Sequence, residues 1–244
     1  MGTSRGIFVT GTDTGVGKTL ITAGILRWLR HHGINAAPMK PVQTGGEARD
    51  GRLIAPDLEF CLAASGIQAS QDDIKLMAPY VYEPACSPHL AGRMAQHYPE
   101  LSRIKDCAGK LLQNYQVVVV EGAGGVMVPL NESFTMLDLM KELDYPVVLV
   151  SRFGLGTINH TLLSIHTMQT SGLKLIGIVF NHTERPQAED RFIEEDNPVT
   201  IAQFSGARVL GQIGYLENLN PEKEETWQHF EKGMTGLENI LLEV

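Results

Sequence analysis

A glycine-rich segment near the start of the chain carries the residues best suited to binding phosphate. It reads Gly11-Thr12-Asp13-Thr14-Gly15-Val16-Gly17-Lys18-Thr19 and stands between a β-rich run and a helical pattern. Glycines let backbone N–H groups turn toward an anion, and the following helix adds unpaired N–H groups and its positive dipole end. Lys18 would reach the terminal phosphates and Thr19 would bind Mg²⁺. Thr12 stands where the strict phosphate-loop pattern has its first glycine, so the motif departs at one position.

Two acidic residues are candidates for holding a metal ion beside that loop. Glu121 directly follows the apolar run 117–120, at the edge of a parallel sheet where ligands bind. Asp57 follows Pro56 and could cap a helix, bind a metal or do both. Mg²⁺ prefers oxygen ligands, and one or two carboxylates usually suffice. The alternative for Glu121 is a solvated acid at a strand end.

A second lysine has a position that suits charge stabilisation. Lys40 ends a second β-rich run and begins the segment Lys40-Pro41-Val42-Gln43-Thr44-Gly45. An isolated lysine at a strand end is usually just solvated. At this sheet edge its ammonium would point at the phosphate crevice, where it could stabilise a transferring phosphoryl group.

The elements that must position these residues alternate along the chain. We predict strands over residues 7–10, 34–39, 116–120, 146–150, 173–180 and 208–213. We predict helices over residues 20–32, 101–113, 136–143, 157–170 and 195–205, and an exposed amphipathic helix over 222–242. The run 117–120 is apolar throughout, as in a parallel strand covered on both faces. This alternation predicts an α/β fold with a doubly wound, mostly parallel sheet flanked by helices. The phosphate loop at residues 11–19 makes it a fold of the P-loop NTPase type. The segment 41–56, rich in Gly, Pro and charge, is predicted to be a functional loop.

Composition narrows the class of protein. The chain has 244 residues, of which 43% are hydrophobic and 20% charged, which excludes a disordered chain and favours one domain over 1–244. A net charge of −8 disfavours a nucleic-acid partner. The three cysteines form no C-x-x-C pair, which fits a reducing cytosol. No apolar run approaches the ~20 residues that span a bilayer, so we expect a cytoplasmic protein without a membrane partner.

Together these segments resemble the dethiobiotin synthetase family. The resemblance covers about residues 6–217, most of the chain. It rests on six signatures that occur in this order: the loop 11–19, Lys40-Pro41-Val42, Ser87-Pro88-His89, Glu121-Gly122-Ala123-Gly124-Gly125, Gly156-Thr157-Ile158-Asn159-His160, and Asn181.

The resemblance implies an ATP- and Mg²⁺-dependent ligase of biotin synthesis. Members of this family join CO₂ to 7,8-diaminopelargonic acid, so that one amine becomes a carbamate. ATP phosphorylates the carbamate to a carbamic–phosphoric anhydride. The second amine then closes the ureido ring of dethiobiotin with release of ADP and phosphate, which makes the enzyme a cyclo-ligase that forms carbon–nitrogen bonds. The family works as a homodimer, with the substrate site completed across the interface.

The resemblance also implies roles for individual residues. Lys18 and Lys40 would be catalytic, neutralising the carbamate and the γ-phosphoryl group, and Thr19, Asp57 and Glu121 would hold Mg²⁺. The ATP contacts would be Thr14, Gly15, Val16, Gly17, Lys18, Thr19, Leu20, Asp57, Glu121, Gly122, Ala123, Gly124, Asn181, Gly214, Tyr215, Leu216 and Glu222, with Asn181 at the adenine edge. The contacts to the diamine would be Thr44, Ser87, Pro88 and His89, and, across the interface, Leu155, Gly156, Thr157 and Asn159.

Three other interpretations of the phosphate loop remain. The main one is a regulatory P-loop ATPase switch of the partition or division type. Such switches carry a lysine early in the loop, whereas this chain has Thr12-Asp13-Thr14 there. The acidic segment 222–243 also disfavours docking on an anionic membrane. An amide-forming synthetase of the cobyrinic-acid type would need a glutaminase domain, for which no room is expected after residue 217. A non-catalytic nucleotide-binding module is the third interpretation.

Overall fold

A six-stranded parallel sheet forms the centre of the molecule. The computed structural model describes residues 6–243. The strands of this sheet are β1 (Gly6–Gly11), β2 (Ala36–Met39), β7 (Val117–Gly125), β8 (Val147–Ser151), β9 (Leu175–Asn181) and β10 (Val209–Ile213). Their order is β10-β9-β8-β1-β7-β2, and every neighbouring pair is parallel. The predicted doubly wound parallel sheet is therefore confirmed, and β7 extends beyond the strand predicted over 116–120 through Gly125.

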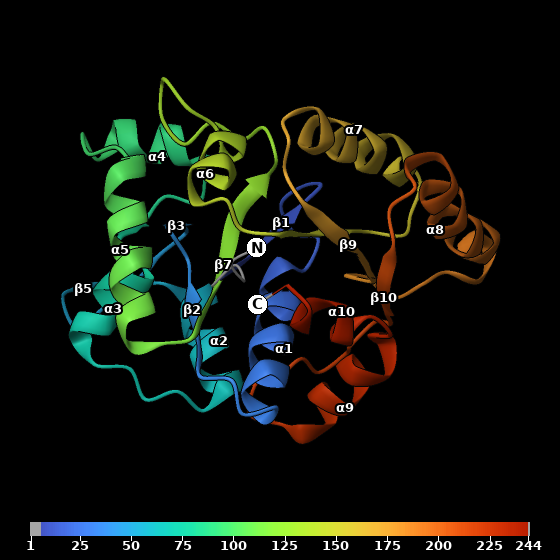
Figure 1. The fold of residues 1–244 in the computed structure, drawn as a ribbon, viewed down its shortest axis with the longest axis horizontal. Helices are drawn as coiled ribbons and strands as arrows, with labels where there is room; N and C mark the ends of the chain where they lie inside the picture. The colour runs from blue at the N-terminus through green and yellow to red at the C-terminus, as the bar shows by residue number, and fades with distance from the viewer. Residues whose placement is uncertain (1–5, 244) are drawn as a thin grey trace.

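Helices cover both faces of this sheet (Figure 1). One face carries α1 (Lys18–His31), α2 (Pro56–Ser65), α9 (Glu224–Gly233) and α10 (Leu237–Leu241). The other carries α3 (Gln71–Met77), α4 (Pro88–Met94), α5 (Leu101–Asn114), α6 (Met136–Leu143), α7 (Thr157–Thr170) and α8 (Arg191–Ser205). Successive valines of β7 point to opposite sides, Val118 into one core and Val119 into the other. Within residues 6–243, no helix is long and apolar enough to cross a membrane.

Helix α1, which follows the phosphate loop, is positioned by its apolar residues and ends just before a glycine turn. Its buried residues Ile21, Ile25 and Leu29 recur every four positions and pack on the sheet. The chain then turns at Gly33, whose φ of 78° is a left-handed conformation that glycine adopts without strain. The helix predicted over residues 20–32 is confirmed as α1, which starts two residues earlier and ends one residue earlier than predicted.

The segment predicted as a loop contains short strands. Within it lie β3 (Val42–Thr44), β4 (Glu47–Arg49) and β5 (Arg52–Ile54). Strand β3 pairs in parallel with β6 (Tyr80–Tyr82), and β4 forms an antiparallel hairpin with β5. Strands of three residues are too short to show a periodic pattern, so sequence reasoning did not find them.

The carboxyl-terminal region differs from the prediction of one exposed helix over 222–242. The structure has two helices, α9 and α10, separated by a short break in which the N–H of Gly236 donates to the carbonyl of Leu210. Trp227 and Phe230 are buried against the α1 face of the sheet. Gly24 of α1 makes room for Phe230, because a Cβ at Gly24 would lie 2.3 Å from that ring. The amphipathic pattern was correct, but its apolar side packs on α1 rather than facing water.

Candidate functional site

A cavity of about 720 Å³ opens at the carboxyl ends of β1, β2 and β7. Five segments far apart in the sequence contribute to its lining: the loop 14–19 and the stretches 40–45, 56–57, 85–88 and 121–128. The edge of a parallel sheet at the carboxyl ends of its strands is where such folds bind ligands. The cavity therefore lies where the strand-end residues of the sequence were expected to meet.

The phosphate loop joins β1 to α1 through glycines in left-handed conformations. Gly15 has φ of 74° and Gly17 has φ of 95°. A Cβ on Gly17 would lie 2.1 Å from Nδ2 of Asn181, so only glycine fits there. The Lys18 ammonium donates to the backbone carbonyl of Asp13 at 2.8 Å and so closes the loop on itself. Together these features leave the start of α1 facing the cavity, as anion binding requires.

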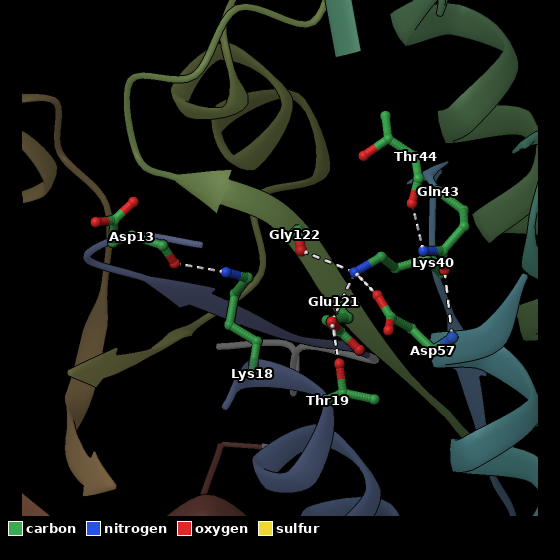
Figure 2. Close-up of polar contacts among 9 residues, drawn as sticks. All are labelled: Asp13, Lys18, Thr19, Lys40, Gln43, Thr44, Asp57, Glu121 and Gly122. Atoms are coloured by element: carbon green, nitrogen blue, oxygen red, sulfur yellow. Dashed lines mark hydrogen bonds and ion pairs between the residues drawn. The ribbon is translucent and has the colours of Figure 1, made fainter. Parts of the chain in front are cut away.

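Lys40 is the centre of a buried cluster of charges (Figure 2). Its Nζ lies 2.6 Å from Oδ2 of Asp57 and 2.6 Å from Oε1 of Glu121. The Thr19 hydroxyl donates to the same Glu121 oxygen at 2.9 Å, and Lys40 also donates to the carbonyl of Gly122 at 3.3 Å. The residue that follows β2 and the side chains of α1, α2 and β7 thus meet at one point.

The protonation states follow from burial and from this cluster. Burial, together with the nearby Lys40 charge, lowers the pKa of Lys18 to about 8. Burial also acts to lower the pKa of Lys40, but the Glu121 and Asp57 carboxylates outweigh it and raise that pKa. For Asp57 the effect of burial is outweighed by Lys40, which lowers the pKa of the carboxyl. Burial raises the pKa of Glu121 despite Lys40. Lys40 and Asp57 are therefore a charged pair, and Lys18 is the lysine closer to neutrality.

The donor set fits a divalent cation. The Thr19 hydroxyl and the carboxylates of Asp57 and Glu121 are oxygen donors, the kind that Mg²⁺ prefers. Both carboxylates lie 2.6 Å from the Lys40 ammonium, so their oxygens face the same point. Across residues 6–243 no group of three or more His, Cys, Asp and Glu side chains could hold a metal, so this set depends on the threonine.

Most of the predicted phosphate, metal and diamine residues meet in this cavity. Those lining it are Thr14, Gly15, Gly17, Lys18, Thr19, Lys40, Thr44, Asp57, Ser87, Pro88, Glu121, Ala123 and Gly124. Gly122 contributes its carbonyl to Lys40. Val16 and Leu20 are buried in the core beneath the loop and do not line the cavity. His89 lies on α4 beside the cavity wall and is not part of that wall.

The residues predicted to contact adenine lie on the β9 and β10 side of the phosphate loop. Asn181 ends β9 and is buried, and its Nδ2 donates to the carbonyl of Val16 at 3.1 Å. Its Oδ1 is buried with no hydrogen-bond partner among the described residues, so a polar acceptor is left open at this point. Gly214, Tyr215, Leu216 and Glu222 follow β10 in the connection to α9, where His229 contacts the carbonyl of Gly214 at 3.2 Å.

The turn between β8 and α7 lies apart from the cavity. Leu155, Gly156 and Asn159 line a separate shallow pocket on α7, and Leu155 is 87% exposed. Thr157 is buried, and its hydroxyl donates to the carbonyl of Arg152 at 2.6 Å. None of these four predicted substrate residues lines the cavity, although Arg152, just before the turn, pairs with Asp13 of the phosphate loop at 3.7 Å.

Sequence reasoning missed polar residues of the cavity wall. Gln43 lines the cavity and is only 5% exposed, and Cys86 lines it beside Ser87. The only signal for Gln43 in the sequence is its place between Lys40 and Thr44. A thiol at Cys86 could suggest a nucleophile, but within residues 6–243 no histidine or carboxylate is hydrogen-bonded to it.

Comparisons with known proteins identify the family of this chain. A family model described as an AAA domain matches residues 5–223. The ATP-dependent dethiobiotin synthetase BioD of Anoxybacillus flavithermus is 37% identical over 92% of this chain and 100% of its own length. The chain belongs to the dethiobiotin synthetase family. The enzyme of the same name from Clostridium kluyveri is 33% identical over 98% of this chain and 97% of its own. The names of these relatives support an ATP-dependent ligase.

Solved structures show the same fold at low sequence identity. The MinC:MinD cell division protein complex of Aquifex aeolicus matches with a TM-score of 0.58 and 14% identity, covering 98% of this chain and 96% of that chain. A ParA family ATPase from Chlorobium tepidum matches with a TM-score of 0.54 and 13% identity, covering 96% of this chain and 92% of that chain. These likenesses confirm the P-loop NTPase type of fold and carry no further argument about function.

Proposed function

We propose that the chain is a single-domain, ATP- and Mg²⁺-dependent ligase that makes dethiobiotin from 7,8-diaminopelargonic acid and CO₂ or bicarbonate. One observation carries this proposal: two lysines, Lys18 and Lys40, face one cavity in which two carboxylates and a hydroxyl converge. A lysine in the phosphate loop suits ATP binding, whereas a second, buried lysine suits an additional anionic reactant. Family membership supports the same reaction.

In this proposal the phosphate loop holds the nucleotide. The N–H groups at the start of α1 and the Lys18 ammonium bind the β- and γ-phosphates, for which Lys18 exchanges its present bond to the Asp13 carbonyl. Thr19, Asp57 and Glu121 hold Mg²⁺, which when bound would neutralise phosphate charge. Asn181 and the connection after β10 contact adenine.

Lys40 has the role of binding the carbamate. One amine of the diamine attacks CO₂ and loses a proton, which leaves a carbamate anion. Its oxygen attacks the γ-phosphorus and ADP leaves, which gives the carbamic–phosphoric anhydride. The second amine attacks the carbamoyl carbon, phosphate leaves, and the ureido ring closes. Lys40 stabilises negative charge at the carbamate and at the transferring phosphoryl group. Thr44, Ser87 and Pro88 line the space that the diamine would occupy.

We also propose that the site is completed in a homodimer. The turn 154–159 opens α7 with a glycine N-cap, so its free N–H groups suit the carboxylate of the substrate. Exposed Leu155 and Leu163 on the same surface favour a protein contact rather than water. Because the turn lies apart from the cavity in one chain, a partner copy would supply it.

The test is ADP release from ATP, Mg²⁺ and bicarbonate, with and without 7,8-diaminopelargonic acid. Stimulation of ADP release by the diamine supports the ligase. ADP release that is indifferent to the diamine would instead support a regulatory ATPase switch. Absence of ADP release under both conditions would contradict both activities.

A further inference from the structure

A buried glutamine joins the two segments that carry the candidate reactive groups. Gln43 lies on β3, lines the cavity and is almost completely buried. Its side-chain amide has one donor end and one acceptor end, and both are used within the structure (Figure 2). A buried amide with both ends satisfied holds its partners at fixed positions.

The acceptor end compensates for a weak start of α2. The N-cap of this helix is Ala55, which has no side-chain oxygen to offer, and Pro56 at the first position has no N–H. The first N–H of the helix therefore belongs to Asp57. Oε1 of Gln43 accepts a hydrogen bond from that N–H at 3.3 Å. A side chain of β3 therefore replaces the hydrogen bond that an N-cap side chain would make.

The donor end holds the neighbouring residue on the opposite side. Nε2 of Gln43 donates to the backbone carbonyl of Thr44 at 2.9 Å. One side chain thus links the backbone of Thr44, a proposed diamine contact, with the backbone of Asp57, a proposed metal ligand. The same two segments are also joined by the ion pair between Lys40 and Asp57.

These two links respond differently to a bound reactant. The Lys40 ammonium is shared between Asp57 and Glu121 and must turn at least partly toward a carbamate to stabilise it. The two hydrogen bonds from Gln43 to backbone atoms join neutral groups, so they do not depend on which partner the Lys40 ammonium has.

We propose that Gln43 is a positioning residue that keeps Asp57 and Thr44 in place while Lys40 exchanges its carboxylate partners for substrate. The part of this proposal that concerns the diamine and the carbamate rests on the proposed function. The bridge itself has consequences for cation binding that can be measured without the diamine.

The experiment compares Gln43→Met with Gln71→Met. Methionine matches glutamine in length and suits a buried position, but it makes neither hydrogen bond. Gln71 is an exposed residue at the start of α3 that accepts from Arg52 at 3.0 Å, so the control makes the same chemical change away from the cavity. Each variant is measured for melting temperature, for binding of a non-hydrolysable ATP analogue without metal, for Mn²⁺ binding in the presence of that analogue, and for kcat and the KM of the diamine.

For Gln43→Met we expect analogue binding within about twofold of wild type, because the phosphate loop is untouched. We expect the Mn²⁺ dissociation constant to rise about fivefold and the KM of the diamine about tenfold, since two bonds that orient the site are lost. Gln71→Met should leave all of these values within about twofold. Equal values for the two variants would overturn the proposal. So would a parallel loss of melting temperature, analogue binding and Mn²⁺ binding, because that pattern marks a residue that only supports the fold.

A second variant separates the two ends of the bridge. Gln43→Glu keeps an acceptor for the Asp57 N–H and replaces the donor to Thr44 by an oxygen. It should retain Mn²⁺ affinity and still raise the KM of the diamine; weaker Mn²⁺ binding would contradict the bridge to Asp57. If the wild-type chain makes no dethiobiotin, the proposed function fails, and the Mn²⁺ measurements on both variants still decide whether the bridge acts as inferred.

Discussion

Two turns of this molecule have nearly the same backbone and opposite surroundings. Gly17 caps α1 with φ of 95° and ψ of 24°, and Gly156 caps α7 with φ of 88° and ψ of −12°. Each follows a neighbouring parallel strand, β1 or β8, and opens a helix of 14 residues. The turn at Gly17 faces a cavity with buried charges, whereas the turn at Gly156 presents the exposed Leu155.

The difference between the two turns shows which part of the proposed site a single copy of the chain contains. At the first turn, Lys40 is paired with Asp57 and Glu121. Lys18 donates to the backbone carbonyl of Asp13, so both lysines are held in place before any ligand binds. At the second turn, the helix start has a suitable dipole and no charged partner in the cavity. We infer that the turn at Gly17 binds phosphate and that the turn at Gly156 acts only in contact with a second copy of the chain.

The largest effect should come from removing the central charge of the first turn. Lys40→Gln should lower kcat on the order of a thousandfold, because the charge that stabilises the transferring group is lost. Binding of an ATP analogue should stay within about threefold, since Lys18 and the loop are unchanged. Steady-state kinetics and analogue titration check this, with Lys75→Gln on exposed α3 as the control. Turnover like that of wild type would remove Lys40 from the mechanism.

The next largest effect should come from changing Glu121, one of the two acids paired with Lys40. Glu121→Gln keeps the shape and removes a charged oxygen ligand, so the Mg²⁺ concentration that gives half-maximal activity should rise about a hundredfold. Glu142→Gln, which breaks the surface pair with Lys105, is the matched control. An Mg²⁺ titration unchanged by Glu121→Gln would rule out this residue as a ligand.

A change at the second turn tests whether it needs a partner. Leu155→Glu places a charge on the exposed apolar surface of the turn and should shift a dimer toward monomer, with about a tenfold loss of kcat/KM. Phe192→Glu is the control, because Phe192 is also exposed, on α8, away from the pocket at Leu155. Sedimentation velocity and kinetics report the result. Unchanged mass and activity for Leu155→Glu would show that this turn acts without a second copy.

The pH dependence of nucleotide binding should follow Lys18. Its pKa of about 8 is lowered from the usual value, so the ammonium is present below pH 8 and is lost as pH rises above it. Phosphate binds the charged form, so the affinity for an ATP analogue should fall by up to about tenfold per pH unit above 8. Titrations with the ATP analogue at several pH values check this. In Lys18→Met the affinity should no longer fall with pH above 8. An affinity that rises with pH would contradict the assignment.

The smallest effect should come from the proposed adenine contact. Asn181→Ala should reduce the preference for ATP over other nucleoside triphosphates about fivefold, as expected for the loss of one neutral hydrogen bond. Competition binding with GTP and CTP measures this preference. Equal weakening for all nucleotides would mean that Asn181 serves only to support the loop through the Val16 carbonyl.

The sequence predicted the parts of this site that follow from strand ends and glycine turns. Glu121 and Lys40 could be placed because parallel strands end at one edge, and Gly17-Lys18-Thr19 because a strand and a helix flank it. Gln43 could not be found, since its role depends on an α2 start that lacks its own cap. The carboxyl-terminal helices were misplaced because amphipathic periodicity does not say which surface the apolar side meets. The two turns at Gly17 and Gly156 look alike in sequence, and only the folded surroundings distinguish them.

The proposed reaction in this cavity joins CO₂ to a diamine with hydrolysis of ATP to ADP and phosphate. The most direct measurement incubates the wild-type chain with ATP, Mg²⁺, ¹³C-bicarbonate and 7,8-diaminopelargonic acid, and analyses the product by mass spectrometry. We expect dethiobiotin that carries the label in its ureido carbon, formed with one ADP per product and absent without ATP. ATP consumption without any labelled product would contradict the proposed ligase activity.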